Sequence, residues 1–96
     1  MSKRLTGELL MHNLSGLEGW TLNEAQTTIS RSFRFEDFNA AFGFMSRIAL
    51  KAEKLDHHPD WHNVYNTVDV TLSTHDVGGI SEKDIVMARF IAELAG

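Results

Sequence analysis

The sequence predicts an α+β domain, a four-stranded antiparallel sheet with helices packed on one face, in the order α-β-β-α-β-β-α. Two kinds of apolar spacing support this fold class. Apolar residues recur at helical intervals over residues 38–55, and they alternate with polar residues over residues 27–35 and 67–73. Each predicted pair of strands is followed by a helix, an order that suits an antiparallel sheet with helices stacked against it.

The length and composition favour one cytoplasmic domain. The chain has 96 residues, of which 43% are hydrophobic and 23% charged, enough for a single core spanning residues 1–96. No apolar run approaches the roughly 18 residues of a membrane span, and the N-terminal residues lack the apolar stretch of a secretory signal. The net charge of −4 argues against direct nucleic-acid binding. The absence of cysteine excludes disulfides and thiolate metal sites.

The N-terminal third is expected to hold a short helix and a hairpin. Thr6 can cap a helix over residues 7–14, because a threonine hydroxyl can accept from the free N–H groups of a first turn. Residues 20–22 are the expected hairpin partner of the strand at 27–35.

The strongest periodic signal predicts a helix of about five turns over residues 38–55. Glu36 and Asp37 stand at its positive end, and Lys51 and Lys54 lie near its negative end, which suits the helix dipole. The expected buried face consists of Phe38, Ala41, Phe42, Met45, Ile48, Ala49, Ala52 and Leu55.

The same helix carries a second set of apolar or small residues on its other side, namely Ala40, Gly43, Phe44 and Leu50. A surface helix of a small monomer usually has a polar back. We therefore expect this second face of the 37–55 helix to be a self-association surface. The alternative is that Phe44 and Leu50 are singly exposed apolar residues, which are common on protein surfaces.

The C-terminal part should hold a second hairpin and a last helix. Residues 61–65 and 67–73 are predicted strands, and residues 74–79 form a loop. Ser81 and Asp84 are spaced as a capping box that begins the last helix. The expected buried face of that helix contains Ile85, Ala88, Ile91, Ala92 and Ala95.

Titratable side chains are concentrated in residues 53–61, where the long helix ends. His57 and His58 are adjacent, so one proton on the pair is favoured over two, and the pair can hold an acid and a base together near neutral pH. Glu53, Asp56 and Asp60 are near enough in sequence to orient an imidazole or stabilise its charged form. These features make the segment a candidate site for acid–base chemistry.

His75 is the third candidate, because it lies in the loop that follows the strand at 67–73. A helix end and a strand end can meet at one rim of a sheet, so this loop could lie beside the His57-His58 pair. Two alternatives stay open. The pair could be a solvated turn after a helix, or the three histidines could bind a metal ion.

Several blocks of the sequence match one known family: DFN at 37–39, AFGFM at 41–45, AEKLDHHP at 52–59, NVYN at 63–66 and TLSTH at 71–75. Together with Trp61 and the upstream Gly19-Trp20, they resemble the pterin-4a-carbinolamine dehydratases. In animals, members of this family are also known as dimerisation cofactors of a homeodomain transcription factor. The resemblance covers most of the chain.

The resemblance implies an enzyme that converts 4a-hydroxytetrahydropterin to quinonoid dihydropterin and water, in tetrahydrobiopterin recycling for aromatic amino acid hydroxylases. It implies no metal or cofactor. It also implies a homo-oligomer, a dimer or tetramer formed through the 37–55 helix, and a protein partner such as a transcription factor. The competing class is a non-enzymatic transcriptional cofactor of the same fold.

The resemblance also implies the residues of the site. His57, His58 and His75 match the catalytic histidines, with His57 and His75 expected to transfer protons and His58 to hold and polarise the pterin. Glu53 and Trp20 are the expected supporting residues. The expected substrate contacts are Asp56, His57, His58, Ser73, Thr74, His75 and Asp76.

Overall fold

A computed structural model of the chain describes residues 3–96. The elements in chain order are α1 (Gly7–Leu14), β1 (Thr21–Leu22), β2 (Ile29–Arg34), α2 (Phe38–Leu55), β3 (Asp60–Val64), β4 (Thr67–Leu72), the 3-10 helix η1 (His75–Val77) and α3 (Glu82–Ala95). The predicted fold class and the order α-β-β-α-β-β-α are confirmed. Among residues 3–96, no helix combines the length and apolar character that a membrane span requires.

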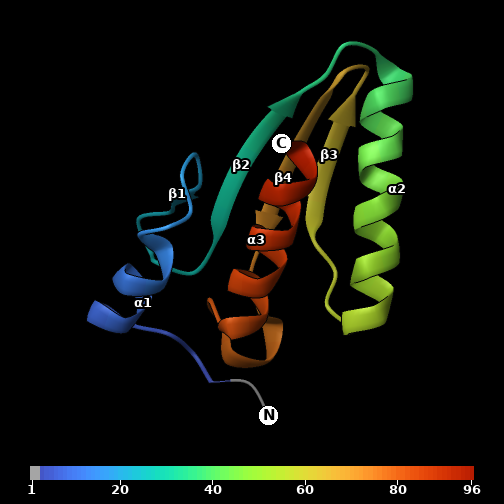
Figure 1. The fold of residues 1–96 in the computed structure, drawn as a ribbon. Helices are drawn as coiled ribbons and strands as arrows, with labels where there is room; N and C mark the ends of the chain where they lie inside the picture. Colours follow the sequence, from blue (N-terminus) through green and yellow to red (C-terminus); the bar gives the residue numbers. More distant parts are fainter. Residues whose placement is uncertain (1–2) are drawn as a thin grey trace.

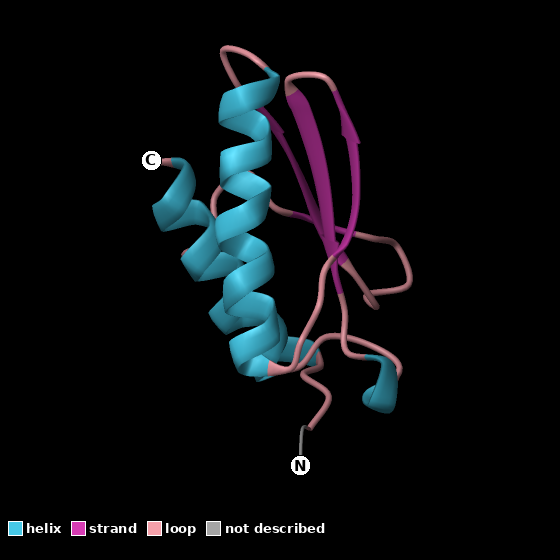
Figure 2. Cartoon of the chain, turned by 90° about the vertical axis from the view of Figure 1, so that its right-hand side faces the viewer, coloured by secondary structure: helices cyan, strands magenta, loops and turns pink. Residues whose placement is uncertain are grey.

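The four strands form one antiparallel sheet in the order β1-β2-β4-β3. The central strands pair with Ile29 opposite Leu72 and Phe33 opposite Val68, and all four side chains are buried. Helices α2 and α3 lie side by side against one face of the sheet (Figure 1). The view turned by 90° shows the two long helices and the sheet as two layers (Figure 2).

The hydrophobic core lies between these two layers. The ring of Phe44 in α2 packs against two aromatic rings of the sheet side, with centroids 5.0 Å from Phe33 and 4.7 Å from Phe35. The sheet also buries Val68, Val70 and Leu72, and α3 contributes Ile85, Met87, Ala88 and Ile91. Burial of these side chains holds the start of α3 close to the end of β4.

The buried face of α2 differs from the prediction. Phe44, assigned to the back of the helix, is only 3% exposed, whereas Phe38 and Phe42, assigned to the core, are 47% and 56% exposed. Ala49 is exposed as well. Apolar residues occupy more than half of the circumference of this helix, so their spacing does not define the centre of the buried stripe. Packing against the aromatic rings of the sheet side selects Phe44.

The predicted helix caps have different outcomes. Thr6 stands at the N-cap position of α1, but its hydroxyl makes no capping hydrogen bond, so the predicted side-chain cap is wrong. The capping box of α3 is present: Ser81 Oγ accepts from the Lys83 N–H at 3.2 Å, and Asp84 Oδ2 accepts from the Ser81 N–H at 2.9 Å. Asp37 caps α2 by accepting from the Ala40 N–H at 2.8 Å.

Candidate active site

A cavity of about 430 Å³ lies where the end of α2, the end of β4 and the start of α3 meet. We call it the histidine cavity. Residues 56–60, residues 73–76 and Lys83 line it. His57 and His58, at the end of α2, therefore share one cavity with His75, which lies in the loop after β4, and every residue expected to contact the substrate lies in its wall.

The end of α2 directs His57 into this cavity. Asp56 has a left-handed backbone with φ 51°, a conformation that is uncommon for residues other than glycine. The Asp56 N–H bonds to the Glu53 carbonyl at 3.3 Å, and the His57 N–H bonds to the Ala52 carbonyl at 3.0 Å. This is the Schellman pattern that ends a helix and reverses the chain. The reversal turns His57 back toward α3.

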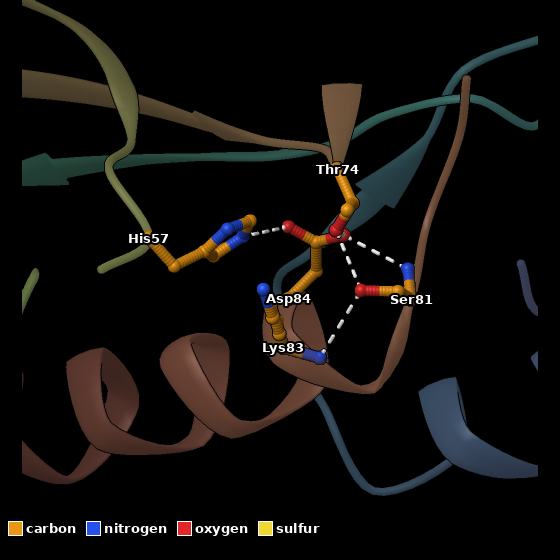
Figure 3. A network of polar contacts seen from close by, with 5 residues as sticks. All are labelled: His57, Thr74, Ser81, Lys83 and Asp84. Atoms are coloured by element: carbon orange, nitrogen blue, oxygen red, sulfur yellow. Dashed lines mark hydrogen bonds and ion pairs between the residues drawn. The ribbon is translucent and has the colours of Figure 1, made fainter. Parts of the chain in front are cut away.

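The imidazole of His57 is held by a buried carboxylate (Figure 3). His57 is 8% exposed, and its Nε2 lies 2.6 Å from Oδ1 of Asp84, which is fully buried. The other oxygen of Asp84 accepts from the hydroxyl of Thr74 at 2.7 Å and from the N–H of Ser81 at 2.9 Å. The carboxylate thus joins α2, the loop after β4 and α3.

Proton counting defines the donors of this network. A carboxylate only accepts, so Thr74 and the Ser81 N–H donate to Asp84, and His57 donates its Nε2 proton. The Ser81 hydroxyl lies 2.6 Å from the Thr74 hydroxyl, whose proton is already used, and therefore donates to it. The Lys83 N–H in turn donates to the Ser81 hydroxyl. With Nε2 engaged, Nδ1 is the nitrogen of His57 that remains for chemistry.

The neighbouring histidine has different surroundings. Nε2 of His58 lies 2.9 Å from Oε1 of Glu53, and both side chains are exposed. Glu53 therefore contacts His58, while Asp84 rather than Asp56 holds His57. Exposed ion pairs contribute little, about 0 to 1 kcal/mol, so His58 is held less firmly than His57.

His75 is exposed at the first position of η1, on the wall formed by the loop after β4. The Thr74 N–H bonds to the Gly79 carbonyl at 2.6 Å, and the Gly78 N–H bonds to the His75 carbonyl at 3.1 Å. Gly78 has a φ of 64°, which glycine adopts without strain. The loop that carries His75 is therefore closed on itself by hydrogen bonds.

Trp20 does not line the histidine cavity. Its ring meets Phe33 edge to face with centroids 6.2 Å apart, and its indole nitrogen is buried without a hydrogen-bond partner in the described part of the chain. The structure thus places this expected supporting residue in the packing of the core.

Residues 3–94 of the chain match the pterin 4 alpha carbinolamine dehydratase family. The chain belongs to this family. The resemblance predicted from the sequence is confirmed, and so is the expected enzyme class, a dehydratase.

Two relatives in this family are similar in sequence to this chain over nearly its whole length. A protein of Burkholderia ambifaria, provisionally named pterin-4-alpha-carbinolamine dehydratase, is 55% identical over 91 residues, which cover 95% of this chain and 89% of that protein. A protein of Burkholderia pseudomallei with the same name is 53% identical over 94 residues, covering 98% and 93%.

Two solved structures have the same fold. The transcriptional coactivator/pterin dehydratase of Brucella melitensis is 52% identical, with a TM-score of 0.94 over 98% of this chain and 100% of that one. A pterin dehydratase-like protein described as a RuBisCO assembly factor of the alpha-carboxysome is 21% identical, with a TM-score of 0.70 over 82% and 92%. The second likeness concerns the fold alone.

Part of the cavity wall and of its hydrogen-bond network is not predicted from the sequence. The sequence indicates Asp84 only as a capping residue, and it does not indicate Lys83 as part of the site. The available signal was the position of Asp84 in the first turn of α3, where a carboxylate is common for capping alone. Its second partner, His57, is distant in sequence and could not be read from that spacing.

Among residues 3–96, no group of three His, Asp or Glu side chains is arranged to hold a metal ion. Two of the three histidines of the cavity instead each pair with a single carboxylate, His57 with Asp84 and His58 with Glu53.

Proposed function

We propose that the chain dehydrates 4a-hydroxytetrahydropterin to quinonoid dihydropterin by histidine acid–base catalysis. The supporting observation is the imidazole of His57, anchored through Nε2 to the buried Asp84 in a cavity that it shares with His58 and His75. Family membership supplies the reaction class. The cavity volume of about 430 Å³ lies within the range typical of small-molecule sites, roughly 300–1,000 Å³.

The reaction needs one acid and one base. The bond between carbon 4a and the hydroxyl oxygen breaks, and the oxygen takes a proton and leaves as water. The neighbouring ring nitrogen loses its proton, and its electron pair forms the new carbon–nitrogen double bond. Each well-placed proton donor or acceptor typically accelerates such a step about 10²- to 10⁴-fold.

The surroundings of the histidines suggest their roles. Nδ1 of His57 is left for substrate, because Asp84 engages Nε2 and orients the ring. His75, on the wall formed by the loop after β4, serves as the second proton-transfer group. His58 holds and polarises the pterin from the exposed side. The residues on either side, Asp56 and Asp76, provide acceptors for the N–H groups of the pterin ring.

In this proposal, the dehydration supports tetrahydrobiopterin recycling for aromatic amino acid hydroxylases. The product is an oxidised, quinonoid pterin, so a reductase must act after this enzyme before the pterin can serve again as a cofactor. A cytoplasmic location fits this role.

We also propose that the chain self-associates through the exposed side of α2. Phe38 and Phe42 form a ring pair with centroids 5.6 Å apart on the surface, and Leu50 is exposed on the same helix. A Cβ added at Gly43 would meet nothing within 4 Å, so no contact within the chain requires glycine there. Glycine inside a helix costs about 1 kcal/mol relative to alanine. The close approach of a second copy of the chain would account for a glycine at position 43.

A transcriptional coactivator role is the second candidate, because the Brucella melitensis relative carries that description beside pterin dehydratase. The exposed aromatic pair of α2 would provide the protein contact. The two functions use different surfaces, so loss of dehydration through the histidine cavity would leave this contact intact.

The test of the dehydratase proposal is the decay rate of 4a-hydroxytetrahydropterin, followed by its ultraviolet absorbance. The wild-type protein should accelerate the decay, and His57→Ala should reduce that acceleration about 10²-fold or more. His62→Ala is the matched control, since His62 is an exposed histidine of β3 outside the cavity, and should keep the wild-type rate. A wild-type protein that leaves the decay rate unchanged would refute the proposal.

A further inference from the structure

A second hollow, of about 610 Å³, lies beside the histidine cavity. Its apolar walls are Leu5 from the N-terminal segment, Leu9 of α1, Leu55 of α2 and Val86 of α3. We call it the leucine groove. Leu9 and Val86 are large apolar side chains that remain 57% and 41% exposed. Such apolar surface, gathered in a concave site, is typical of a ligand-binding region.

The leucine groove adjoins the histidine cavity. Lys83 lines both hollows. Along α2 and its end, Leu55 lines the groove and the next residue, Asp56, lines the cavity. Figure 3 shows the Lys83 side chain extending from the start of α3 toward the His57 ring. A ligand that fills the histidine cavity can therefore extend past Lys83 into the groove.

The charges of the groove favour an anionic group. Lys3 and Lys83 provide two positive charges against the single negative charge of Glu82. Coulomb attraction between a lysine and a carboxylate falls with distance and salt, but two ammonium groups beside apolar walls suit a ligand that has an aromatic body and an acidic end.

The position of Lys83 is electrostatically unfavourable for the helix that carries it. It is the second residue of α3, in the first turn, where the helix dipole favours negative charge. None of the ion pairs in residues 3–96 involves Lys83. A side chain whose charge is unfavourable at its place in a helix, and that has no ion pair within the chain, often serves a function. Lys83 is free to bind a ligand anion.

We propose that the leucine groove binds the ring substituent of the substrate, and that the preferred substituent is an aryl group extended by an acidic end, as in the aminobenzoyl-glutamate chain of folate-type pterins. This inference rests on the proposed function, since the pterin ring itself would occupy the histidine cavity. The aromatic part packs on Leu9, Leu55 and Val86, and the carboxylate pairs with Lys83 and Lys3. A short hydroxyalkyl substituent would fill little of the groove.

The test compares two fluorescent probes that share the pterin ring. Biopterin carries a short dihydroxypropyl chain, and folic acid carries an aminobenzoyl-glutamate chain. Their dissociation constants are measured by fluorescence titration of the wild-type protein at low salt. Burial of the aryl group and pairing of the carboxylate should make folic acid bind about tenfold more tightly than biopterin, after the cost of ordering the longer chain.

Two exposed positions of α1 provide a matched pair of variants. Leu9→Asp places a negative charge in the groove, whereas Met11→Asp makes a comparable change at a residue that is 48% exposed and does not line it. Leu9→Asp should weaken folic acid binding to the level of biopterin and leave biopterin binding unchanged. Met11→Asp should change neither. Lys3→Glu, at an exposed residue, should weaken folic acid binding severalfold.

The outcomes separate this inference from the proposed function. The proposed binding role of the leucine groove would be refuted if the wild-type protein bound both probes with equal affinity. It would also be refuted if Leu9→Asp and Lys3→Glu both kept the preference for folic acid. Neither result would contradict the dehydratase proposal. Failure of both probes to bind would count against a pterin site altogether, and therefore against both.

Discussion

Asp84 uses one carboxylate for two purposes. Oδ2 caps the first turn of α3 and accepts from Thr74, while Oδ1 anchors the imidazole of His57. A buried carboxylate is costly unless its oxygens are satisfied by donors, and here three donors converge on it. The same bonds that stabilise the helix end therefore define which nitrogen of His57 faces the cavity.

We predict that Asp84→Asn slows dehydration about 10²-fold and destabilises the fold by about 1–3 kcal/mol. An asparagine has one acceptor oxygen in place of two. It therefore cannot accept from His57 while also accepting from the Thr74 hydroxyl and the Ser81 N–H. Either the imidazole changes tautomer or the cap loses an acceptor. Decay assays and urea denaturation of the same variant give the two quantities.

A double variant distinguishes positioning from a purely structural effect. If Asp84 acts through the imidazole, His57→Ala combined with Asp84→Asn should be no slower than His57→Ala alone, because coupled residues are not additive. Independent, multiplicative losses of rate would show that Asp84 does not act by orienting His57.

At the scale of the elements, the N-caps of α1 and α3 differ in what they contribute to stability. Ser81 is fully buried, caps α3 and joins the network through Thr74, whereas the exposed Thr6 makes no capping bond. Ser81→Ala should reduce the free energy of unfolding by about 1–2 kcal/mol. Thr6→Ala should change it by less than about 0.5 kcal/mol. Urea titrations of both variants check this, and equal effects would contradict the assigned difference.

The long helix shows what periodicity can and cannot predict. Its existence, its bounds at Phe38–Leu55 and most of its core residues follow from the apolar spacing. The exchange of Phe42 and Phe44 between surface and core does not, because both residues lie on apolar arcs of the helix. The rings of Phe33 and Phe35, which come from another segment, decide which phenylalanine is buried.

At the scale of the whole molecule, the exposed Phe42 and not the buried Phe44 is the position at which to test self-association. Phe42→Asp should convert an oligomer to a smaller species, measured by multi-angle light scattering, because it places a charge on the exposed aromatic pair. Phe44→Asp would instead put a charge into the core and unfold the chain.

Met11→Asp is the control for this experiment, since Met11 is an exposed apolar residue of α1 and should leave the molar mass unchanged. Circular dichroism shows whether the Phe42→Asp variant remains folded. A wild-type protein that is already monomeric at micromolar concentration would contradict the proposed assembly.

By itself, the sequence determined the α+β class, the order of the elements, the family and the segments that carry the candidate histidines, because these depend on local spacing and contiguous blocks. The tertiary structure decided three further features. It paired His57 with Asp84, packed Trp20 against the core instead of in the wall of the cavity, and set the leucine groove beside Lys83. The physical reason is that each depends on contacts between segments distant in the chain, which arise only when the helices pack on the sheet.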